Sequence, residues 1–259
     1  MGTAPVGEPF VLLPPSESKA PGGDGAAYDP TAGSFGALAA GRRKVSQGLR
    51  RRDFDATAHL GVKGTALAAA MRSNRALATA RTLPALRRYT GVLYDALAYA
   101  ERSSALRRQL DVQVLVVSGL LGLVRGDDPV PPYKVPIGAA LPGLGRLATF
   151  WRPRLIAPLA TALGTSVVWD LLPAAHASAV TIPAGVTCWR VLVQRECAGR
   201  RSTVSHENKT VKGALAAAVI AGAFEHPDRL ASWVGPGGYR LREVSWNQQG
   251  GTLALVTAT

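Results

Sequence analysis

Two short segments of the sequence concentrate side chains that bind anions or exchange protons. The first is Ser16-Glu-Ser-Lys19, which follows the apolar run Phe10-Val-Leu-Leu13 and two prolines. Its hydroxyls, the Glu17 carboxylate and the ammonium group can bind a substrate or act in acid–base chemistry. The same residue types are equally typical of a turn that caps a following helix, so both interpretations stay open. We take Glu17 as a candidate catalytic residue and Ser16 and Lys19 as candidate ligand-binding residues.

The second segment runs from Ser205 to Gly213 and reads Ser-His-Glu-Asn-Lys-Thr-Val-Lys-Gly. Lys209 and Lys212 are three residues apart, so they share one face of a helix. They follow a predicted helix N-terminus, where unpaired N–H groups favour anions. Free histidine titrates near neutral pH, which makes His206 a candidate for proton transfer, although a single histidine beside a hairpin is more often structural. The predicted anion-binding residues of this segment are Ser205, Asn208, Lys209 and Lys212.

Tyrosines form a third group of candidates. Tyr94 ends the run Tyr89-Thr-Gly-Val-Leu-Tyr94, and Tyr133 precedes Lys134. Phenol rings stack on bases and their hydroxyls donate hydrogen bonds to phosphate, which makes Tyr94 a candidate catalytic residue and Tyr133-Lys134 a candidate ligand-binding pair. Tyrosines are just as often core residues with one satisfied hydroxyl, so this interpretation also stays open.

The motifs of several enzyme classes are absent from the sequence. It contains no Gly-x-Ser-x-Gly, no Walker A pattern, no Gly-x-Gly-x-x-Gly and no His-Glu-x-x-His. This argues against the familiar hydrolases, NTPases, dehydrogenases and zinc proteases. Two cysteines, Cys188 and Cys197, lie without histidines or cysteines at zinc spacing, so we predict no metal site and a reducing compartment.

The charge balance predicts anionic partners. The 259 residues contain 30 Lys and Arg against 17 Asp and Glu, a formal charge of +13. Such an excess favours nucleic acid or phosphorylated ligands, although surface arginines alone can also produce it. The longest apolar stretches, 114–124 and 214–224, are shorter than the roughly 20 residues of a membrane-spanning helix. The first nine residues do not form a signal peptide. We therefore predict a cytoplasmic protein without a membrane partner.

Apolar runs and turn signals alternate as in an α/β protein. We predict a single domain over 10–259, with a central mixed sheet and surrounding helices, after a flexible extension at 1–9. Buried strands are expected at 10–13, 112–117 and 166–169, an antiparallel hairpin at 186–194 and 202–205, and a final β pair at 237–242 and 252–256. Helices are expected at 72–77, 86–98 and 208–224, around Phe150-Trp151 and over the basic stretch 42–52.

A basic region near the N-terminus is the predicted nucleic-acid contact. Residues 58–68 resemble a helix-hairpin-helix, in which a glycine turn brings backbone N–H groups close to a phosphate. The helix-hairpin-helix-like region spans about 56–78, but Lys63 occupies the position of the second glycine and Gly64 comes one residue late, so a plain corner between two helices fits at least as well. The predicted nucleic-acid-binding residues are Arg50, Arg51, Arg52, Lys63, Arg87 and Arg88.

Six segments, taken in order, resemble motifs of the YaaA peroxide-stress family. They are Val11–Lys19, Tyr89–Leu97, Val116–Val124, Pro132–Lys134, Leu141–Gly145 with Trp151, and Ser205–Gly213. The resemblance implies a mixed α/β fold with a helix-hairpin-helix element, and a cytosolic protein of the peroxide-stress response linked to limiting free iron and oxidative DNA damage. It also implies binding to duplex or distorted DNA, and it implies no cofactor.

The chain departs from the family pattern inside these motifs. Asp170-Leu-Leu-Pro-Ala-Ala-His176 stands where Asp-Leu-Arg-Ser-x-x-Tyr is usual, and Tyr133-Lys-Val-Pro136 where Tyr-Arg-Leu-Ser is usual. Glu207 replaces a usual Phe, and Ser18 a usual Gly. Leucine in place of arginine at 172 removes a bidentate phosphate fork, which a lysine cannot reproduce. These changes indicate either a pocket altered for a different ligand or drift in an inactive one.

Three functions remain open at this level. The first is a nucleic-acid-binding stress protein. The second is a divergent enzyme of a specialised pathway that acts on a nucleobase, a nucleotide or another phosphorylated small molecule. The third is a binding protein without catalysis. The sequence leaves the substrate, the reaction and the oligomeric state undetermined.

Overall fold

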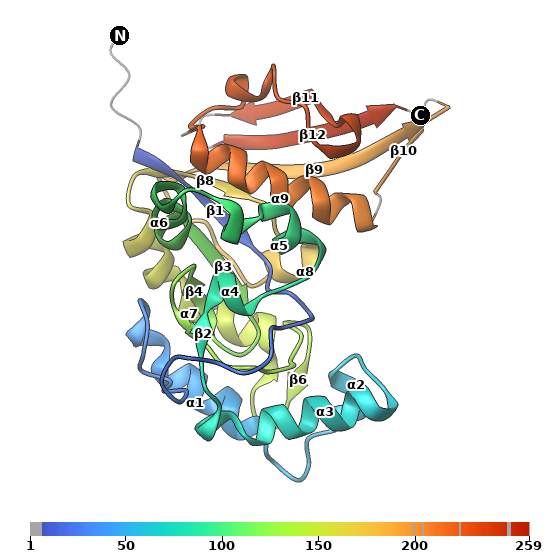
Figure 1. Ribbon diagram of the computed structural model, residues 1–259. Coiled ribbons are helices and arrows are strands. Elements are labelled where there is room, and N and C mark those ends of the chain that lie inside the picture. The colour runs from blue at the N-terminus through green and yellow to red at the C-terminus, as the bar shows by residue number, and fades with distance from the viewer. Residues whose placement is uncertain (1–6, 199, 204, 223, 248–249, 259) are drawn as a thin grey trace.

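A mixed β-sheet occupies the upper half of the computed structural model (Figure 1). The structure describes residues 7–198, 200–203, 205–222, 224–247 and 250–258. The side chains of Thr203, Ser205, His206 and Ala258 lie outside that description. Within it, eight strands follow the order β11-β12-β9-β8-β1-β3-β4, with β10 paired to β9. This arrangement confirms the predicted α/β fold with a central mixed sheet.

Five neighbouring strands are parallel, with one antiparallel strand at each edge and a third paired to the end of the inner strand β9. The parallel strands are β3 (Val114–Ser118), β1 (Gly7–Leu13), β8 (Ser166–Asp170), β9 (Thr187–Cys197) and β12 (Gly250–Ala258). The antiparallel strands are β4 (Gly122–Arg125), β10 (Arg200–Thr203) and β11 (Arg240–Asn247). Strands β1, β3 and β8 are nearly continuous apolar runs because helices cover both faces of the sheet.

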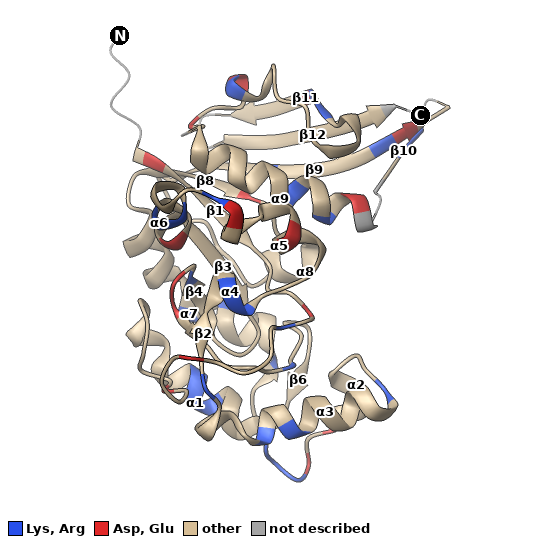
Figure 2. Cartoon of the chain, viewed as in Figure 1, with Lys and Arg blue, Asp and Glu red and all other residues tan. Residues whose placement is uncertain are grey.

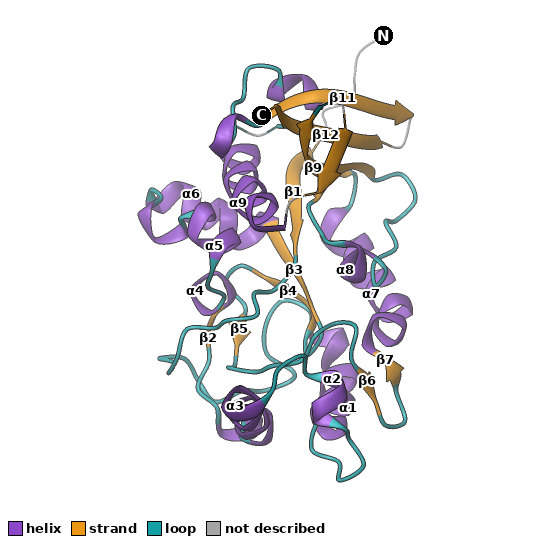
Figure 3. Cartoon of the chain, turned by 90° about the vertical axis from the view of Figure 1, so that its right-hand side faces the viewer, coloured by secondary structure: helices purple, strands orange, loops and turns teal. Residues whose placement is uncertain are grey.

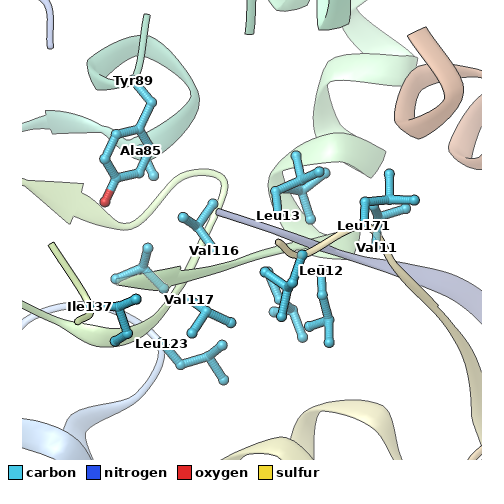
Figure 4. Packing of buried hydrophobic residues seen from close by; sticks show 14 of the residues in the cluster. Val11, Leu12, Leu13, Ala85, Tyr89, Val116, Val117, Leu123, Ile137 and Leu171 are labelled. Atoms are coloured by element: carbon cyan, nitrogen blue, oxygen red, sulfur yellow. The ribbon is translucent and has the colours of Figure 1, made fainter. Parts of the chain in front are cut away.

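Helices cover the two faces unequally. Figure 3 shows α5 (Val92–Leu97), α6 (Ser104–Gln113) and α9 (Ser205–Ala221) on one face, and α7 (Leu147–Leu163) and α8 (Ala174–Ala177) on the other. Figure 4 shows the core between them, where Leu12 and Leu13 of β1 lie between Val116 of β3 and Leu171. None of the helices in the described part of the chain is long and apolar enough to cross a membrane.

The lower half of the molecule consists of short helices and loops (Figure 1). It holds α1 (Ala39–Gly48), α2 (Ala56–His59), α3 (Gly64–Arg75) and α4 (Ala85–Arg88). This half also contains two small antiparallel ribbons. One pairs β2 (Leu83–Pro84) with β5 (Pro129–Val130), and the other pairs β6 (Ala140–Leu141) with β7 (Gly145–Arg146). Short 3₁₀ turns lie at 36–38, 77–79, 99–101, 227–230 and 236–238.

Several predicted boundaries are wrong for identifiable reasons. Strand β1 begins at Gly7, so residues 7–9 belong to the sheet and not to an extension. The predicted helix 86–98 is broken into α4 and α5, because Gly91 adopts a left-handed φ of 94°. Val112 ends up in α6 and not in a strand. Helix α1 ends at Gly48, so Arg50–Arg52 lie in a turn beyond it.

The two predicted β pairs are confirmed, and the structure adds a connection between them. β9 and β10 form an antiparallel hairpin, as do β11 and β12. β12 also inserts beside β9 in parallel register, with Leu253 opposite Val191 and Leu255 opposite Val193. The C-terminal hairpin therefore extends the central sheet and does not form a separate ribbon.

Candidate functional site

Two adjoining cavities lie at the carboxyl ends of β1 and β8, which is where open α/β sheets bind ligands. The larger, about 440 Å³, is lined by the loop after β1, the start of α5, Pro173, His176 and Lys209. We call it the α9 cavity. The smaller, about 170 Å³, is lined by Lys19, Leu60, Gly61, Tyr133, Lys134 and neighbouring residues. We call it the Tyr133 cavity. Both are bordered by Pro15, Ser16, Glu17 and His176, so they adjoin along these four residues.

The turn after β1 is held by the segment that precedes α5. The Ser16 hydroxyl accepts a hydrogen bond from the Thr90 amide at 3.0 Å and itself donates to the Ser18 carbonyl. Lys19 forms a β-bridge with Tyr89. No helix begins here, because the chain continues as a loop to Gly36. Helix capping, one of the two interpretations of this segment, is therefore wrong.

Lys19 extends into the Tyr133 cavity with its nitrogen between aromatic rings. Nζ lies 4.1 Å from the centroid of the Tyr133 ring and 5.4 Å from that of Tyr89, and it donates to the Ser16 carbonyl at 2.9 Å. Burial, followed by the charges of Lys134 and Arg88, lowers the pKa of Lys19 to about 7. The ring faces attract the ammonium form and oppose this shift.

The hydroxyl groups of Tyr133 and Tyr94 form hydrogen bonds within the protein. Tyr133 exchanges hydrogen bonds with the Ser118 hydroxyl at 2.7 Å and the Tyr89 hydroxyl at 3.0 Å, and Tyr94 donates to the Pro14 carbonyl at 2.8 Å. Burial raises the pKa of Tyr133 to about 12 and that of Tyr94 well above its usual value. Tyr94 therefore lines the α9 cavity with its ring while its proton stays on the hydroxyl. This geometry argues against Tyr94 as an acid–base residue.

Glu17 and Lys134 form an ion pair across the mouth of the Tyr133 cavity. Lys134 Nζ lies 3.1 Å from Glu17 Oε2, and the hydrogen bond and charge of Lys134 lower the pKa of this carboxyl. The Glu17 side chain is 83% exposed. Asn74 of α3, which is buried, fixes Lys134 through two hydrogen bonds to its backbone, at 2.8 and 3.0 Å. Glu17 is thus a carboxylate at neutral pH and not a general acid.

His176 borders both cavities and was not among the predicted site residues. Burial lowers the pKa of His176 to about 4, so its imidazole is neutral at pH 7. Its Nδ1 is buried without a hydrogen-bond partner in the described structure. The sequence pointed to His176 through its position, because it ends the segment Asp170–His176, where the family usually has Tyr. Asn74 was harder to predict from the sequence, where it is a polar residue on the buried face of a helix.

The two lysines of α9 have different environments. Lys209 is exposed and lines the α9 cavity. Lys212 points into the protein, where burial lowers its pKa to about 8 while the charge of Asp170 opposes the shift. Asp170 itself is paired with Arg190 of β9 at 2.5 Å. The structure therefore brings Lys209, but not Lys212, to the cavity beside Ser16 and Glu17.

The remaining residues of the Ser205–Gly213 segment do not line either cavity in the described structure. Glu207 pairs with Arg195 and accepts a hydrogen bond from Tyr239 at 2.6 Å, so it joins α9 to the C-terminal part of the sheet. Asn208 is half-buried and its Oδ1 has no hydrogen-bond partner among the described residues. The side chains of Ser205 and His206 lie outside the described part of the chain, so their predicted roles remain predictions.

A close contact between α5 and α9 places the walls of the α9 cavity. Gly213 packs against the Leu93 carbonyl so closely that a Cβ atom there would lie 2.0 Å from its oxygen. This approach brings the start of α5, with Gly91 and Tyr94, next to Lys209 one turn before Gly213. Close packing of α9 on α5 therefore explains the glycine at position 213.

The predicted nucleic-acid residues divide into exposed and buried groups. Arg50, Arg51 and Arg52 are exposed and, with Arg75, line a cavity of about 140 Å³ at the lower end of the molecule. Figure 2 shows Lys and Arg on α1, α3 and the loop between α1 and α2. Lys63 and Arg87 are also exposed, and Arg87 pairs with Asp24 at 2.9 Å.

Arg88 is the exception, and its predicted contact with nucleic acid is wrong. The side chain is fully buried, and its guanidinium donates to the carbonyls of Val130, Ala20, Gly22 and Arg81. Arg42 of the basic stretch is likewise buried and donates to four carbonyls, at 29–33 and 120–124. Both guanidinium groups are buried and used up by backbone carbonyls, some in loops and some in short strands, such as Leu123 of β4 and Val130 of β5.

The helix-hairpin-helix prediction is not confirmed. α2 has a single turn, from Ala56 to His59, and α3 has twelve residues. The turn between them does use left-handed glycines, Gly61 with φ 69° and Gly64 with φ 56°. A plain corner between a short and a longer helix describes the region.

Comparisons with known proteins agree with the motif order. The sequence model of the family described as "Peroxide stress protein YaaA" matches residues 10–244. A UPF0246 protein of Streptomyces coelicolor is 37% identical over 238 residues, which cover 90% of this chain and 91% of that protein. UPF0246 proteins of Corynebacterium efficiens and Corynebacterium glutamicum are 35% and 36% identical, over 80% of this chain and 83% of theirs. The chain therefore belongs to the peroxide stress protein YaaA family.

Proposed function

We propose that this member of the peroxide stress protein YaaA family binds a small anionic molecule, such as a nucleotide or sugar phosphate, in the α9 and Tyr133 cavities. The proposal rests on one observation: residues far apart in the sequence line the same cavity. Ser16 and Glu17 line the α9 cavity together with Lys209, although they are separated by about 190 residues of sequence. Such convergence on a hollow at the ends of parallel strands is typical of ligand sites.

The charges around the two cavities favour an anion. Lys19 and Lys134 line the Tyr133 cavity and Lys209 lines the α9 cavity, while Glu17 is the acidic residue that borders both. The walls are otherwise mainly apolar, with the rings of Tyr94 and Tyr133 and several prolines. Apolar walls with a few placed charges are characteristic of small-molecule sites of about 300–1,000 Å³.

Binding is tested by titrating inorganic phosphate, adenosine 5′-monophosphate and ribose 5-phosphate in a calorimeter. A charge-assisted hydrogen bond contributes about 1.5–3 kcal/mol, so we expect Lys209→Ala or Lys134→Ala to weaken the best ligand about 10- to 100-fold. Lys44→Ala and Lys63→Ala remove the same charge from exposed sites outside the cavities and serve as controls. Equal weakening by all four variants would show that net charge, and not the cavity, determines binding.

A more specific form of this proposal is that the two cavities form an active site and the protein is an enzyme. Its substrate would be a nucleobase, a nucleotide or another phosphorylated small molecule, with Glu17 as base and His176 as a neutral imidazole beside it. Turnover of a bound ligand that is lost in Glu17→Gln, with binding retained, would support catalysis. Binding without turnover of any bound ligand would favour a binding protein.

A second function, nucleic-acid binding, is favoured by the lower end of the molecule. Residues 39–75 carry nine Lys and Arg against two Asp, and all the basic side chains but Arg42 are exposed. A dense basic surface of this kind contacts backbone phosphates without reading sequence. The partner would be duplex or distorted DNA, as the family resemblance implies.

This second function is tested by fluorescence anisotropy with duplex and junction DNA at several salt concentrations. The double variant Arg50→Gln/Arg52→Gln should lower the salt slope by about 2, since each lost phosphate contact removes roughly 0.9. Arg240→Gln/Arg242→Gln on β11 removes equal charge from exposed positions far from the basic runs and should leave the slope unchanged. Loss of slope in both double variants, or no binding at low salt, would contradict the assignment.

A further inference from the structure

Lys19 has an environment that differs from those of the other cavity lysines. Lys134 is paired with Glu17, and Lys209 is exposed. The nitrogen of Lys19 instead lies against two tyrosine rings and one carbonyl, and in the described part of the chain it forms no ion pair with a carboxylate. It nevertheless lines a cavity from which a ligand can reach it. A half-buried amine that makes no ion pair with the described residues, although the Glu17 carboxylate is near it, and that opens to a cavity is typical of nucleophilic lysines.

The protonation of Lys19 is compatible with such a role. Burial and the neighbouring charges of Lys134 and Arg88 lower its pKa to about 7 against the opposing charge of Glu17, so the neutral amine is present in a substantial fraction near neutral pH. An exposed lysine with a pKa near 10.4 has a neutral fraction of roughly one in two thousand at the same pH.

We infer that Lys19 forms an imine with an aldehyde or ketone group of an anionic ligand bound in the Tyr133 cavity. The inference rests on the proposed function, because the same cavities must hold the ligand. It adds the chemical class of that ligand, a small carbonyl compound bearing a phosphate or carboxylate. Lys134 and Lys209 would attract its charge, while its carbonyl carbon faces Lys19.

The reaction needs no oxidant or further reactant. The lone pair of Nζ forms a bond to the carbonyl carbon, and the C=O π electrons move to oxygen, which takes a proton. Nitrogen loses a proton, and the resulting carbinolamine expels its hydroxyl as water after a second protonation, which leaves a protonated imine that releases its remaining proton to give the neutral C=N bond. The products are one C=N bond and one water molecule for each amine and carbonyl consumed. The Lys134 ammonium can supply a proton at the cavity, and the Glu17 carboxylate can accept one.

Borohydride trapping tests the inference directly. The intact protein is incubated with one equivalent of pyridoxal 5′-phosphate, an anionic aldehyde, reduced with sodium borohydride and mapped by peptide mass spectrometry. We expect about one label per chain, at Lys19 in at least tenfold excess over any other lysine, with labelling half-maximal near pH 7. Lys19→Arg keeps the charge but cannot be trapped, so the label should disappear. Lys44→Met and Lys63→Met, which remove exposed lysines, should leave it unchanged.

Pyridoxine 5′-phosphate, the alcohol without a carbonyl group, separates this inference from the proposed function. If the alcohol binds and Lys209→Ala weakens it, but borohydride traps no aldehyde on Lys19, the site stands and the imine is refuted. If neither compound binds, both ideas fail for this ligand class. Label spread evenly over surface lysines, or unchanged labelling in Lys19→Arg, would also refute the imine. Mapping of the unmodified chain decides the question even if a variant fails to fold.

Discussion

Arg88 offers the sharpest test of how the candidate site is held, because a neighbour with the same side chain provides a matched control. Arg88 is fully buried and its guanidinium donates to four backbone carbonyls, two of which, those of Ala20 and Gly22, belong to the loop after Lys19. Arg87 is exposed and makes a surface ion pair with Asp24. Arg88→Met keeps most of the stem and removes the donors, whereas Arg87→Met removes an exposed charge.

The expected difference is large. Arg88→Met removes four hydrogen bonds made by a charged donor, one to the buried Val130 carbonyl and three to part-buried carbonyls, and at about 1 kcal/mol each the total cost should be about 3–5 kcal/mol. Loss of the exposed pair at Arg87 costs about 1 kcal/mol or less. For a chain of this size, each kcal/mol lowers Tm by about 2–4 °C, so Arg88→Met should lower it by about 6–20 °C and Arg87→Met by less than about 4 °C.

The assay is thermal unfolding followed by circular dichroism, together with urea titration at 25 °C. Ligand binding in the Tyr133 cavity should also weaken in Arg88→Met, since the loop that carries Lys19 loses its anchor. Equal Tm values for the two variants would refute the structural role of Arg88. A drop in DNA affinity in Arg88→Met with no loss of stability would refute it as well, and would restore this arginine to the nucleic-acid surface.

Three further predictions follow from the same geometry. Between about pH 7 and 10 the folded chain binds fewer protons at Lys19 than the unfolded chain does, so stability should rise with pH across that window, and Lys19→Met should flatten the rise in urea titrations. Tyr133→Phe removes the hydroxyl that bonds Ser118 but keeps the ring, so it should cost about 1 kcal/mol in urea unfolding and leave Lys19 labelling intact. Gly213→Ala places a Cβ 2.0 Å from the Leu93 oxygen and should cost about 1–3 kcal/mol and weaken ligand binding, and an unchanged Tm would contradict this packing.

The division of basic residues between core and surface bears on how the positive charge should be interpreted. Two arginines of the predicted basic runs, Arg42 and Arg88, serve as internal hydrogen-bond donors for backbone carbonyls of loops and short strands. Arg50, Arg51 and Arg52 of these runs are exposed instead, at the end of the molecule that holds α1 and α3 (Figure 2). The basic residues behind the net charge of +13 therefore have two roles in this fold. Some donate hydrogen bonds to buried carbonyls, and the others create a positive potential at the surface.

The sequence by itself determined the strands and the segments that form the site. Continuous apolar runs such as 10–13 and 166–169 predict buried parallel strands, because both faces of such strands are covered. The polar residues directly after the first run then predict a ligand site at the strand ends. The order of motifs identified the family. The inferences about the strands and the family are confirmed, because each depends on local spacing of residue types, and the ligand site stays a prediction.

Only the tertiary structure decided which side chains face the cavities. The pattern of α9 puts Lys209 and Lys212 on one face, yet Lys212 turns toward Asp170 and Arg190 in the core and Lys209 lines the cavity. In the same way Arg87 and Arg88, identical side chains next to each other, become one exposed and one buried residue. Exposure depends on what other segments pack against each position, and contacts between residues far apart in the chain are not encoded in local spacing.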